Sequence, residues 1–401
     1  SSAASDVYKR QFMFCLFLPD LLSQNGRYFI SVYRKPPLLA RPFLPKFRLF
    51  SPVFSALCVK SMTLPFPVLW GASIRGQISS VFSCFLRKIE YTGSNRKRLL
   101  RPVGAAPEKR SHHMKTGLVL EGGAMRGMFT AGVLDVLMEH DLTTDGTIGV
   151  SAGAVFGCNF KSHQIGRVIR YNTEYCDDKR YASFGNLLRT GNLYSEDFCY
   201  HIVPEKLDPF DEEAFRASPM DFFVVCTDLR TGEPIYHKCR TGDAEDVRWM
   251  EASASMPLAA KAVRIGHYAL LDGGVADSIP VRFFESLGYK RNIIILTQPK
   301  GFVKKKNPFL PAIRARYLRH PAFVAAVADR HERYNETLSY IAMQESTGRD
   351  FVIRPPIPLE IGAMERDPAQ LRRVYDTGRA VAENQLDKIE AFLNEVKEME
   401  E

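Results

Sequence analysis

The 401 residues suffice for one large or two modest domains, and 45% hydrophobic and 25% charged residues are ordinary for a globular protein. Residues 1–113 hold 18 Lys and Arg against 4 Asp and Glu, a net charge of +14, whereas residues 114–401 hold 36 against 41, a net charge of −5. The overall charge of +9 therefore belongs to the first segment. The remainder gives no electrostatic case for binding nucleic acid.

The cysteines and the apolar runs indicate the cellular compartment and whether the chain crosses a membrane. Eight cysteines are scattered along the chain without a C-x-x-C pair or the spacing of metal ligands. We therefore expect reduced thiols in a cytoplasmic protein with no structural metal. No apolar run reaches the ~18 residues of a membrane-spanning helix, so we expect no transmembrane segment.

Residues 1–113 differ in character from the rest of the chain. Their apolar residues follow no period of 2 or 3.6, prolines recur as in KPPLLARPFLPKF (35–47), and acidic residues are almost absent. We expect this segment to be disordered, or to be translated sequence upstream of a native start at Met114. The alternatives are a transit peptide, which is rich in Arg and Ser and poor in acidic residues, and a basic arm for membrane surfaces.

Strands and helices are expected to alternate from Met114 to about residue 300. The expected strands are 116–121, 146–150, 221–227, 267–272 and 291–297, and the expected helices are 127–140, 152–162, 164–176, 243–255 and 281–287. Buried apolar strands that alternate with helices predict an α/β sheet covered on both faces. We therefore expect an α/β domain over residues 114–303.

The pattern changes after a basic, proline-ended stretch, KKKNP (304–308). Long amphipathic stretches follow at 321–346 and 367–400, around a short expected strand at 350–355. Long amphipathic stretches indicate helices that bury one face. We therefore expect a mainly helical C-terminal extension over residues 304–401.

Ser151 lies in a segment with the spacing of a nucleophile elbow, Gly149-Val150-Ser151-Ala152-Gly153. An expected strand precedes it and a helix rich in small residues follows. Gly149 and Gly153 leave room for a tight turn and for close packing of the helix. A serine here lies at a helix N-terminus, where backbone N–H groups favour a developing negative charge. Taken alone, the motif also fits an ordinary strand–helix turn.

A glycine-rich turn, Gly122-Gly123-Ala124-Met125-Arg126-Gly127, follows the first expected strand and opens the first helix. Its N–H groups, helped by the cation of Arg126, could form an oxyanion hole. The rival interpretation is a phosphate-binding dinucleotide turn. That motif requires glycine in place of Ala124 and an acidic residue at the end of the second strand, whereas Asp141 and Asp145 precede that strand.

A serine nucleophile needs a group that takes its proton, and this group is usually a histidine. None of the histidines after Met114 lies in a recognisable motif. Asp272 is the candidate instead, because it ends an expected strand before two glycines and would lie at the sheet edge where ligands gather. The alternatives are a turn-capping role for Asp272 and a Ser-His-Asp hydrolase that uses His320 or His331.

Together and in this order, the three motifs resemble those of the patatin-like phospholipases. Gly122 to Gly127 matches the oxyanion turn of that family, Gly149 to Gly153 its G-x-S-x-G, and Asp272-Gly273-Gly274 its D-G-[AG]. The resemblance covers roughly residues 115–300, with 226–237 similar to the central hairpin and 252–259 to a helix end of small residues. Residues 305–401 resemble the C-terminal extension found in a bacterial subgroup of patatin-like proteins.

The resemblance implies a three-layer α/β/α sandwich with a Ser–Asp dyad in the domain 114–303. It implies that Ser151 attacks an acyl ester and that Asp272 takes its proton and then activates water. The N–H groups of Gly123 and Ala124, with Arg126, would hold the oxyanion. Two positions depart from the family: Ala124 stands where many members have a third glycine, and Ser278 where many have asparagine.

The resemblance also implies the partners. The substrate would be a phospholipid, a lysophospholipid or another acyl ester, with peripheral membrane contact and neither a cofactor nor a metal. Nothing in the residues fixes the acyl chain, the head group or the oligomeric state. From a different class, the same fold could carry a vestigial site in a lipid-binding or regulatory protein.

Overall fold

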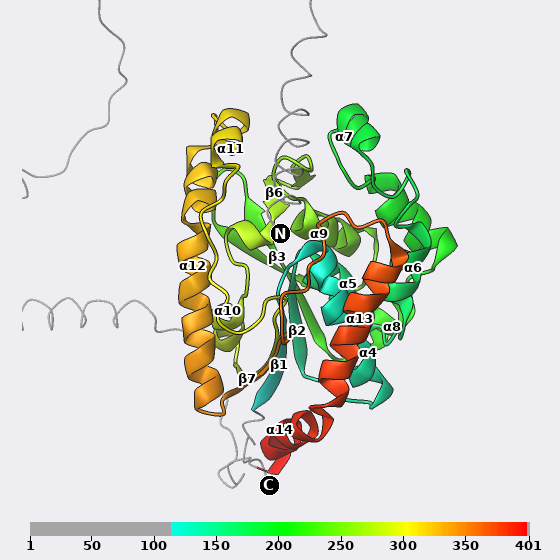
Figure 1. Ribbon diagram of the computed structural model, residues 1–401, viewed down its shortest axis with the longest axis vertical. Helices are drawn as coiled ribbons and strands as arrows, with labels where there is room; N and C mark the ends of the chain where they lie inside the picture. The colour runs from blue at the N-terminus through cyan, green and yellow to red at the C-terminus, as the bar shows by residue number, and fades with distance from the viewer. Residues whose placement is uncertain (1–113, 399–401) are drawn as a thin grey trace, which may run out of the picture. The chain divides into compact units, whose positions relative to one another are not determined.

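The computed structural model describes residues 114–398, with side chains described up to residue 395 (Figure 1). The expectation for residues 1–113, a leader outside the native protein, lies outside the described residues. Everything below concerns the described part of the chain.

A mixed eight-stranded sheet forms the centre, in the order β5-β6-β3-β2-β1-β7-β8, with β4 paired to β3. β1, β2, β3, β7 and β8 are parallel to one another, and β4 and β6 run antiparallel to β3. The strands are β1 (Lys115–Leu120), β2 (Gly146–Val150), β3 (Asp221–Asp228), β4 (Pro234–Cys239), β5 (Val263–Ile265), β6 (Tyr268–Asp272), β7 (Tyr289–Ile295) and β8 (Asp350–Ile353).

Helices cover both faces of this sheet, which confirms the expected three-layer α/β/α architecture (Figure 1). One face carries α4 (Gly127–Glu139), α5 (Ala152–Lys161), α6 (Arg167–Tyr175), α9 (Ala244–Ala254) and α13 (Pro368–Glu383). The other face carries α10 (Val281–Ser286), α11 (Leu310–Arg316) and α12 (Pro321–Ser346). The remaining helices are α7 (Phe184–Thr190), the π-helix η2 (Phe198–Leu207), α8 (Glu212–Ala217) and α14 (Leu386–Glu398), with 3-10 turns η1 (Ala124–Arg126) and η3 (Gly273–Val275).

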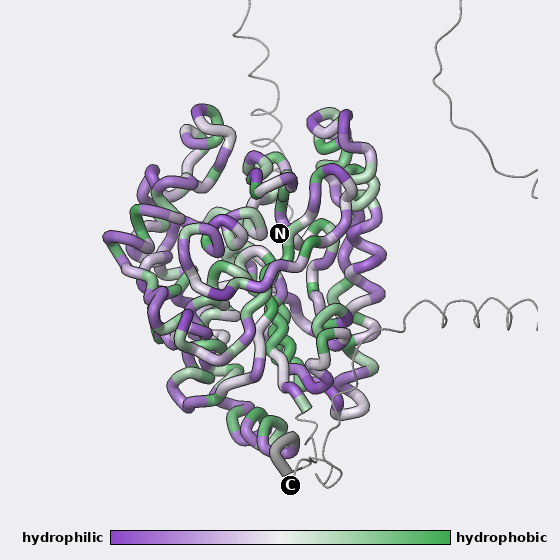
Figure 2. Tube along the Cα trace, turned by 180° about the vertical axis from the view of Figure 1, so that it is seen from behind, coloured by the Kyte–Doolittle hydropathy of each residue, from purple (hydrophilic) through white to green (hydrophobic). Residues whose placement is uncertain are grey.

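The alternation of side chains along the strands divides the core in two. In β1, Leu118 and Leu120 pack under α4 and α13, whereas Val119 packs toward α10 and α12. Figure 2 shows hydrophobic residues concentrated along the central strands and hydrophilic ones frequent on the outer helices. No helix among the described residues combines the length and the apolar character needed to cross a membrane.

The C-terminal extension is mainly helical, and its elements are built into all three layers. β8 extends the sheet beside β7, α12 covers one face, and α13 runs along α4 on the other. The backbones of α4 and α13 approach closely, since a Cβ at Gly378 would lie 2.0 Å from the carbonyl oxygen of Phe129. The described part of the stretch 367–400 forms two helices, α13 and α14, because the chain turns at residues 384–385. The extension thus completes the sandwich.

Candidate active site

Strands β2 and β6 meet end to end along one edge of β3. β2 pairs with residues 221–225 of β3, and β6 continues along the same edge with residues 226–228, because β4 occupies the opposite edge. Val150 therefore lies beside Val225, and Asp272 beside Cys226. The sequence predicted that Asp272 would end a strand beside Ser151. The structure adds that the two strands approach from opposite directions.

Ser151 occupies a sharp turn between β2 and α5. Its φ of 55° and ψ of −123° are unusual for a residue other than glycine, and such conformations cluster at active sites. The turn is closed by two glycines that have no room for a side chain. A Cβ at Gly149 would lie 2.4 Å from the carbonyl oxygen of Gly153, and a Cβ at Gly153 would lie 2.6 Å from that of Leu120. The glycine positions singled out in the sequence are thus explained by close backbone packing.

A buried serine on α9 holds this turn in place. The Ser151 N–H donates to Ser253 Oγ at 2.9 Å, and Ser253 Oγ donates to the carbonyl oxygen of Val225 at 2.6 Å. The Ser253 side chain therefore ties the turn to β3. Sequence reasoning did not assign Ser253, although it lies in the small-residue segment 252–259 that carried part of the resemblance.

The hydroxyl of Ser151 donates a hydrogen bond of 2.7 Å to Asp272 Oδ2, and both side chains are buried. Asp272 Oδ1 accepts the N–H of Gly274 at 2.8 Å. Burial raises the pKa of Asp272 above its usual value, while the charge of Arg330 and the hydrogen bonds from Ser151 and Gly274 oppose that rise. A carboxylate with a raised pKa is a stronger base for the serine proton.

The glycine-rich turn lies directly against the Ser151 turn. Leu120 pairs with Gly149, and a Cβ at Gly122 would lie 3.0 Å from the Cβ of Ser151. Within residues 114–398, the N–H groups of Gly122 and Gly123 form no hydrogen bond, which leaves them available to a ligand oxygen.

The departure from the glycine pattern at Ala124 has a structural consequence. Ala124 has a φ of 48°, in the left-handed region that favours glycine. Arg126 ends the 3-10 turn, and its Nε is buried without a hydrogen-bond partner. At Gly127 the first turn of α4 touches α5, because a Cβ there would lie 2.9 Å from the Cβ of Ala152.

The loop after Asp272 is supported from within the chain. A Cβ at Gly273 would lie 2.0 Å from the carbonyl oxygen of Val225, so this position admits only glycine. Ser278, the second departure from the family, donates to the carbonyl oxygen of Gly274 at 2.7 Å. The serine thus provides support for the aspartate loop.

Helix α12 of the extension also reaches the site, a contribution that no motif or pattern in the sequence indicated. Arg330 Nε donates to Ser278 Oγ at 3.4 Å. Tyr334 donates to Glu121 Oε1 at 2.7 Å, and Glu121 Oε2 accepts the N–H of Thr297 at 2.7 Å. Glu121 directly precedes the glycine-rich turn, so α12 fixes the start of that turn.

The two histidines of the alternative triad do not join this arrangement. His320 precedes the first turn of α12, and His331 Nδ1 lies 2.9 Å from the carbonyl oxygen of Ala328. The described hydrogen bond of the Ser151 hydroxyl goes to Asp272 and to neither histidine. The geometry therefore favours the carboxylate as the proton acceptor.

A largely apolar pocket opens at Ser151. Its empty space is about 1030 Å³, which includes the open mouth. The lining comes from the glycine-rich turn and from α5, α6, η2 and α9, and includes Met125, Val155, Phe156, Tyr171, Tyr181, Tyr200, Val203, Phe210 and Met250. Concave apolar sites with a few polar groups at one end are typical of small-molecule binding.

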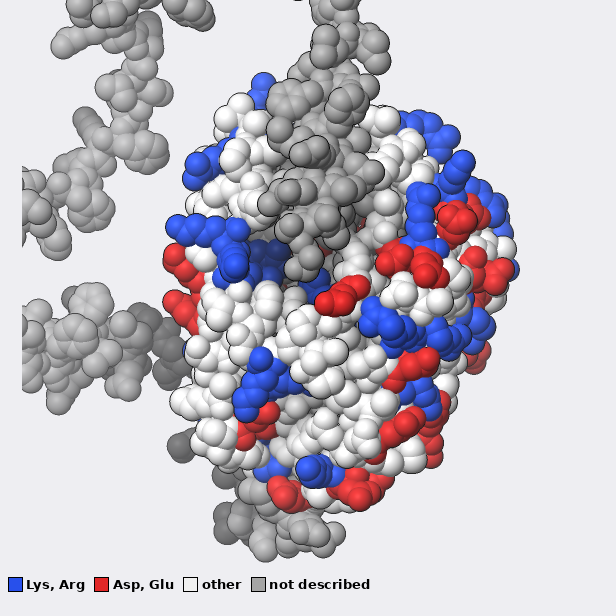
Figure 3. Space-filling model, viewed as in Figure 1, with Lys and Arg blue, Asp and Glu red and all other residues white. Residues whose placement is uncertain are grey.

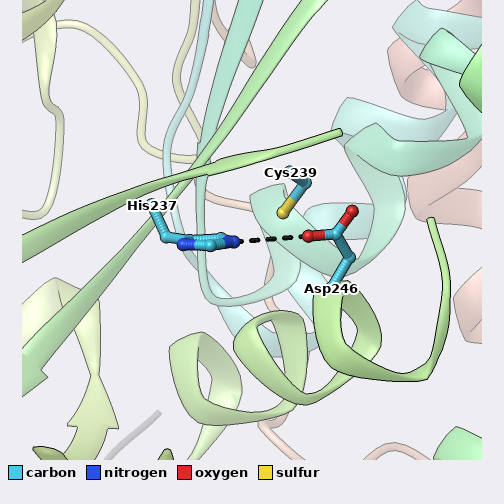
Figure 4. Close-up of side chains that lie close together, drawn as sticks. All are labelled: His237, Cys239 and Asp246. Atoms are coloured by element: carbon cyan, nitrogen blue, oxygen red, sulfur yellow. Dashed lines mark hydrogen bonds and ion pairs between the residues drawn. The ribbon is translucent and has the colours of Figure 1, made fainter. Parts of the chain in front are cut away.

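One group of described side chains has the composition of a metal site, namely His237, Cys239 and Asp246 (Figure 4). Asp246 Oδ2 accepts the backbone N–H groups of residues 240–242, and Oδ1 lies 3.3 Å from His237 Nε2. The His237 ring also stacks on Trp249 at 4.2 Å. The protein's own donors therefore satisfy the carboxylate, and we assign no metal to this cluster.

A glycine-rich turn, an elbow serine and an aspartate loop therefore lie together, in this chain order, on a three-layer α/β sheet. The family profile described as patatin-like phospholipase matches residues 118–284, so the chain carries a domain of that family. A second profile, a domain of unknown function called DUF6363, matches residues 320–394 within the extension.

Three curated proteins are similar to this chain. The uncharacterised protein YjjU of Escherichia coli is 29% identical over 278 residues, which cover 66% of this chain and 75% of the relative. A patatin-like phospholipase domain-containing protein of Caenorhabditis elegans is 28% identical over 43% of this chain and 13% of its own length. An uncharacterised NTE family protein of Mycobacterium tuberculosis is 28% identical over 41% of this chain and 27% of its own length. The last two therefore share only a segment with this chain.

Two solved structures are also similar. VipD from Legionella pneumophila has a TM-score of 0.36 and 12% identity, with 75% of this chain and 73% of that chain covered. The type III effector protein ExoU has a TM-score of 0.30 and 13% identity, with 69% of this chain and 54% of that chain covered.

Proposed function

We propose that this protein is a serine lipid acyl hydrolase that uses Ser151 and Asp272 as a catalytic dyad. The observation that carries the proposal is the 2.7 Å hydrogen bond between Oγ of Ser151, which lines the apolar pocket, and Asp272 Oδ2. The membership of a phospholipase family adds the expectation of a lipid substrate.

The first half of the reaction transfers the acyl group to the enzyme. Ser151 Oγ attacks the ester carbonyl carbon while Asp272 Oδ2 accepts the hydroxyl proton. The oxyanion that forms is held by the N–H groups of Gly123 and Ala124, helped by the charge of Arg126. The proton on Asp272 then passes to the leaving alkoxide, and an acyl-serine remains.

The second half reverses these roles with water. Asp272 takes a proton from a water molecule, whose oxygen attacks the acyl-serine carbonyl in the same oxyanion site. The tetrahedral intermediate collapses, Ser151 recovers its proton from Asp272, and the fatty acid leaves. A raised pKa suits Asp272 for both transfers, because it must accept and release a proton in each cycle.

The pocket supplies the binding energy for the acyl chain. Its lining is apolar and aromatic, and burial of hydrocarbon stabilises by roughly 0.8 kcal/mol per methylene. An acyl chain in the pocket would hold its carbonyl carbon at Ser151, since Ser151 and Ala124 line the same cavity. We therefore expect esters with long acyl chains to be better substrates than acetyl esters.

Labelling with a fluorophosphonate probe tests this proposal directly. In the full-length protein we expect covalent modification at Ser151, mapped by mass spectrometry, and none in Ser151→Ala. Asp272→Asn should slow labelling by at least about 100-fold, because it removes the general base. Ser255→Ala is the matched control, since within residues 114–398 this buried hydroxyl donates only to the carbonyl oxygen of Glu251.

The outcomes separate the proposal from its alternative. Labelling that requires both Ser151 and Asp272 supports a dyad hydrolase. A folded protein that binds lipid vesicles without being labelled would instead be a binding or regulatory protein with a vestigial site. Labelling at wild-type rate in Asp272→Asn would exclude the carboxylate as the base.

A further inference from the structure

Arg330 of α12 lies beside the aspartate loop without pairing directly with the carboxylate. Arg330 Nη2 and Asp272 Oδ1 both lie 3.0 Å from the position that a Cβ at Gly274 would take, so these two atoms are at most twice that distance apart. No ion pair within 4.0 Å joins Arg330 to any carboxylate among the described residues. The guanidinium therefore lies at roughly 4–6 Å, a distance at which an opposite charge still favours the ionised form of a carboxyl group.

Contacts within the chain fix the guanidinium in this place. Arg330 Nε donates to Ser278 Oγ at 3.4 Å, and Ser278 Oγ donates to the carbonyl oxygen of Gly274 at 2.7 Å. The N–H of Gly274 donates in turn to Asp272 Oδ1 at 2.8 Å. Arg330 and the proposed base are thus the two ends of one chain of contacts, which joins α12 to the end of β6.

Gly274 leaves room for the two charged groups to approach each other. A Cβ at this position would lie 3.0 Å from both side chains, closer than ordinary van der Waals contact. One neighbour would have to move, and Asp272 is held by its hydrogen bonds to Ser151 and Gly274. The flexible end of the arginine side chain would therefore be displaced, so glycine at position 274 permits its close approach.

The charged and titratable groups around this pair come from several elements. Beside Asp272 lies the buried thiol of Cys226 on β3. Arg330 is surrounded by one carboxylate, two cations and one phenol, which are Glu121 directly after β1, Arg126 in η1, Lys304 in the segment before α11, and Tyr334 on α12 itself.

The carboxylate of Glu121 is already occupied by hydrogen bonds. Its Oε1 accepts from the Tyr334 hydroxyl, and its Oε2 accepts from the N–H of Thr297. In Figure 3, basic side chains gather over the upper part of α12 and continue into the hollow toward the centre of that face. Positive charge is therefore in excess on the side of the site that α12 covers, and Glu121 does not pair with Arg330.

The charge of Arg330 acts on the proposed base. Burial raises the pKa of Asp272, and the charge of Arg330 is the largest effect that opposes this rise, ahead of the hydrogen bonds from Ser151 and Gly274. A cation favours the carboxylate over the carboxylic acid, and only the carboxylate can accept the serine proton.

We propose that Arg330 is a positioning residue for the reaction, because its charge keeps Asp272 in the ionised form that accepts the Ser151 proton. This inference rests on the proposed dyad and deepens it. It gives the C-terminal extension, whose residues 320–394 match a domain of unknown function, a part in the chemistry. Helix α12 then acts on the base through a charge, in addition to its contact with the start of the glycine-rich turn.

The pH dependence of covalent labelling tests the role of this charge. In the labelling reaction Ser151 Oγ bonds to the phosphorus of a fluorophosphonate, fluoride leaves, and Asp272 takes the hydroxyl proton. An uncharged probe has no titratable group, so the acid limb of the rate reports an ionisation of the enzyme. In the full-length protein we expect Arg330→Gln to move this limb to higher pH by at least about one unit, because loss of the cation raises the pKa of Asp272 further. Well above the limb, labelling should approach the parent rate.

Two further variants separate the charge from structural support. Arg330→Lys retains a cation and should return the limb to within about half a pH unit of the parent. Arg333→Gln is the matched control, because Arg333 donates from the same helix to the carbonyl oxygens of Val275 and Ala276 in the same loop. It removes support from the loop but should leave the acid limb where it is in the parent.

The outcomes distinguish the role of Arg330 from the hydrolase. An unchanged limb in Arg330→Gln, or an equal shift in Arg333→Gln, would overturn the role of Arg330, while labelling at Ser151 would leave the hydrolase intact. A limb that Arg330→Lys fails to restore would also overturn it, since the charge would then not be the cause.

Two situations call for a second measurement. If Arg330→Gln does not fold, Gly274→Ala replaces it, because the added Cβ displaces the guanidinium without removing it; a limb that does not move to higher pH would overturn the proposal. If the parent is not labelled, the proposed function fails, and the NMR resonance of the Asp272 carboxyl carbon, assigned with Asp272→Asn, is titrated in the folded parent and in Arg330→Gln. A higher midpoint in the variant supports the effect of Arg330 on the carboxylate, and equal midpoints overturn it.

Discussion

Ser253 offers the sharpest test of how the chain holds its candidate nucleophile. Its fully buried hydroxyl accepts the N–H of Ser151 at 2.9 Å and donates to the carbonyl oxygen of Val225 at 2.6 Å. Ser253→Ala removes both bonds and leaves two buried backbone groups without partners. Each orphaned group costs about 1–3 kcal/mol, so we expect the free energy of unfolding to fall by about 2–6 kcal/mol.

The same change should also affect catalysis. The Ser151 turn has an unfavourable φ and depends on its surroundings to persist. Without the bond from the Ser151 N–H to Ser253 Oγ, the hydroxyl of Ser151 is positioned less well against Asp272, and small misplacements cost up to about 100-fold in rate. We expect kcat on a soluble ester to fall by about 10- to 100-fold.

Urea denaturation and steady-state hydrolysis measure the two effects. Ser255→Ala is the control, because this buried serine lies two residues further on and the described hydrogen bond of its hydroxyl goes to the carbonyl oxygen of Glu251. The reasoning is refuted if Ser253→Ala loses less than about 0.5 kcal/mol, or if the two alanine variants lose stability and activity equally.

Three further predictions follow from single contacts. Gly273→Ala places a Cβ 2.0 Å from the carbonyl oxygen of Val225 and should lower the free energy of unfolding by more than about 3 kcal/mol, whereas Gly185→Ala, with nothing nearer than 3.7 Å, should melt like the parent. Ala124→Gly relieves a left-handed residue with a φ of 48°, so we expect the melting temperature to rise by about 2–4 °C, and an unchanged or lower value would contradict this. Burial raises the pKa of Glu251 to about 7, above its ordinary value of 4.5, so its ionisation destabilises the fold as the pH rises through 7. Glu251→Gln should therefore gain about 2–3 kcal/mol over the parent at pH 8 and almost nothing at pH 4, as measured by urea denaturation.

The local elements could be predicted because their signals lie within a few residues. The strand expected at 146–150 and the helix expected at 321–346 have the same bounds in the structure, since one is a β-branched apolar run and the other a long amphipathic repeat. The glycines that flank Ser151 indicated the turn, because they lie within two residues of it. Asp272 was identified by the D-G-G motif, and the structure places it within hydrogen-bond distance of Ser151. The catalytic roles of both residues stay predictions.

The remaining features depend on pairings between distant segments. Nothing in 267–272 indicates that β6 runs antiparallel to β3 and abuts β2, because strand direction is set by the partner. The amphipathic pattern of 321–346 shows which face is buried but not that Arg330 and Tyr334 lie beside the site. The packing of α13 against α4 could not be predicted either. The two helices approach closely at glycines, and a sequence pattern does not show which glycines face a neighbouring helix.

The dependence of the site on α12 has a consequence for biosynthesis. Tyr334 donates to Glu121 at the start of the glycine-rich turn, and it lies 183 positions after Ser151 in the chain. At the usual speed of translation, about 5–20 residues per second, the ribosome needs roughly 10–40 s to span that interval. During this time the nascent chain holds the serine turn without the helix that completes its surroundings. Any lipid-cleaving activity of this site is therefore withheld until most of the described chain has left the ribosome.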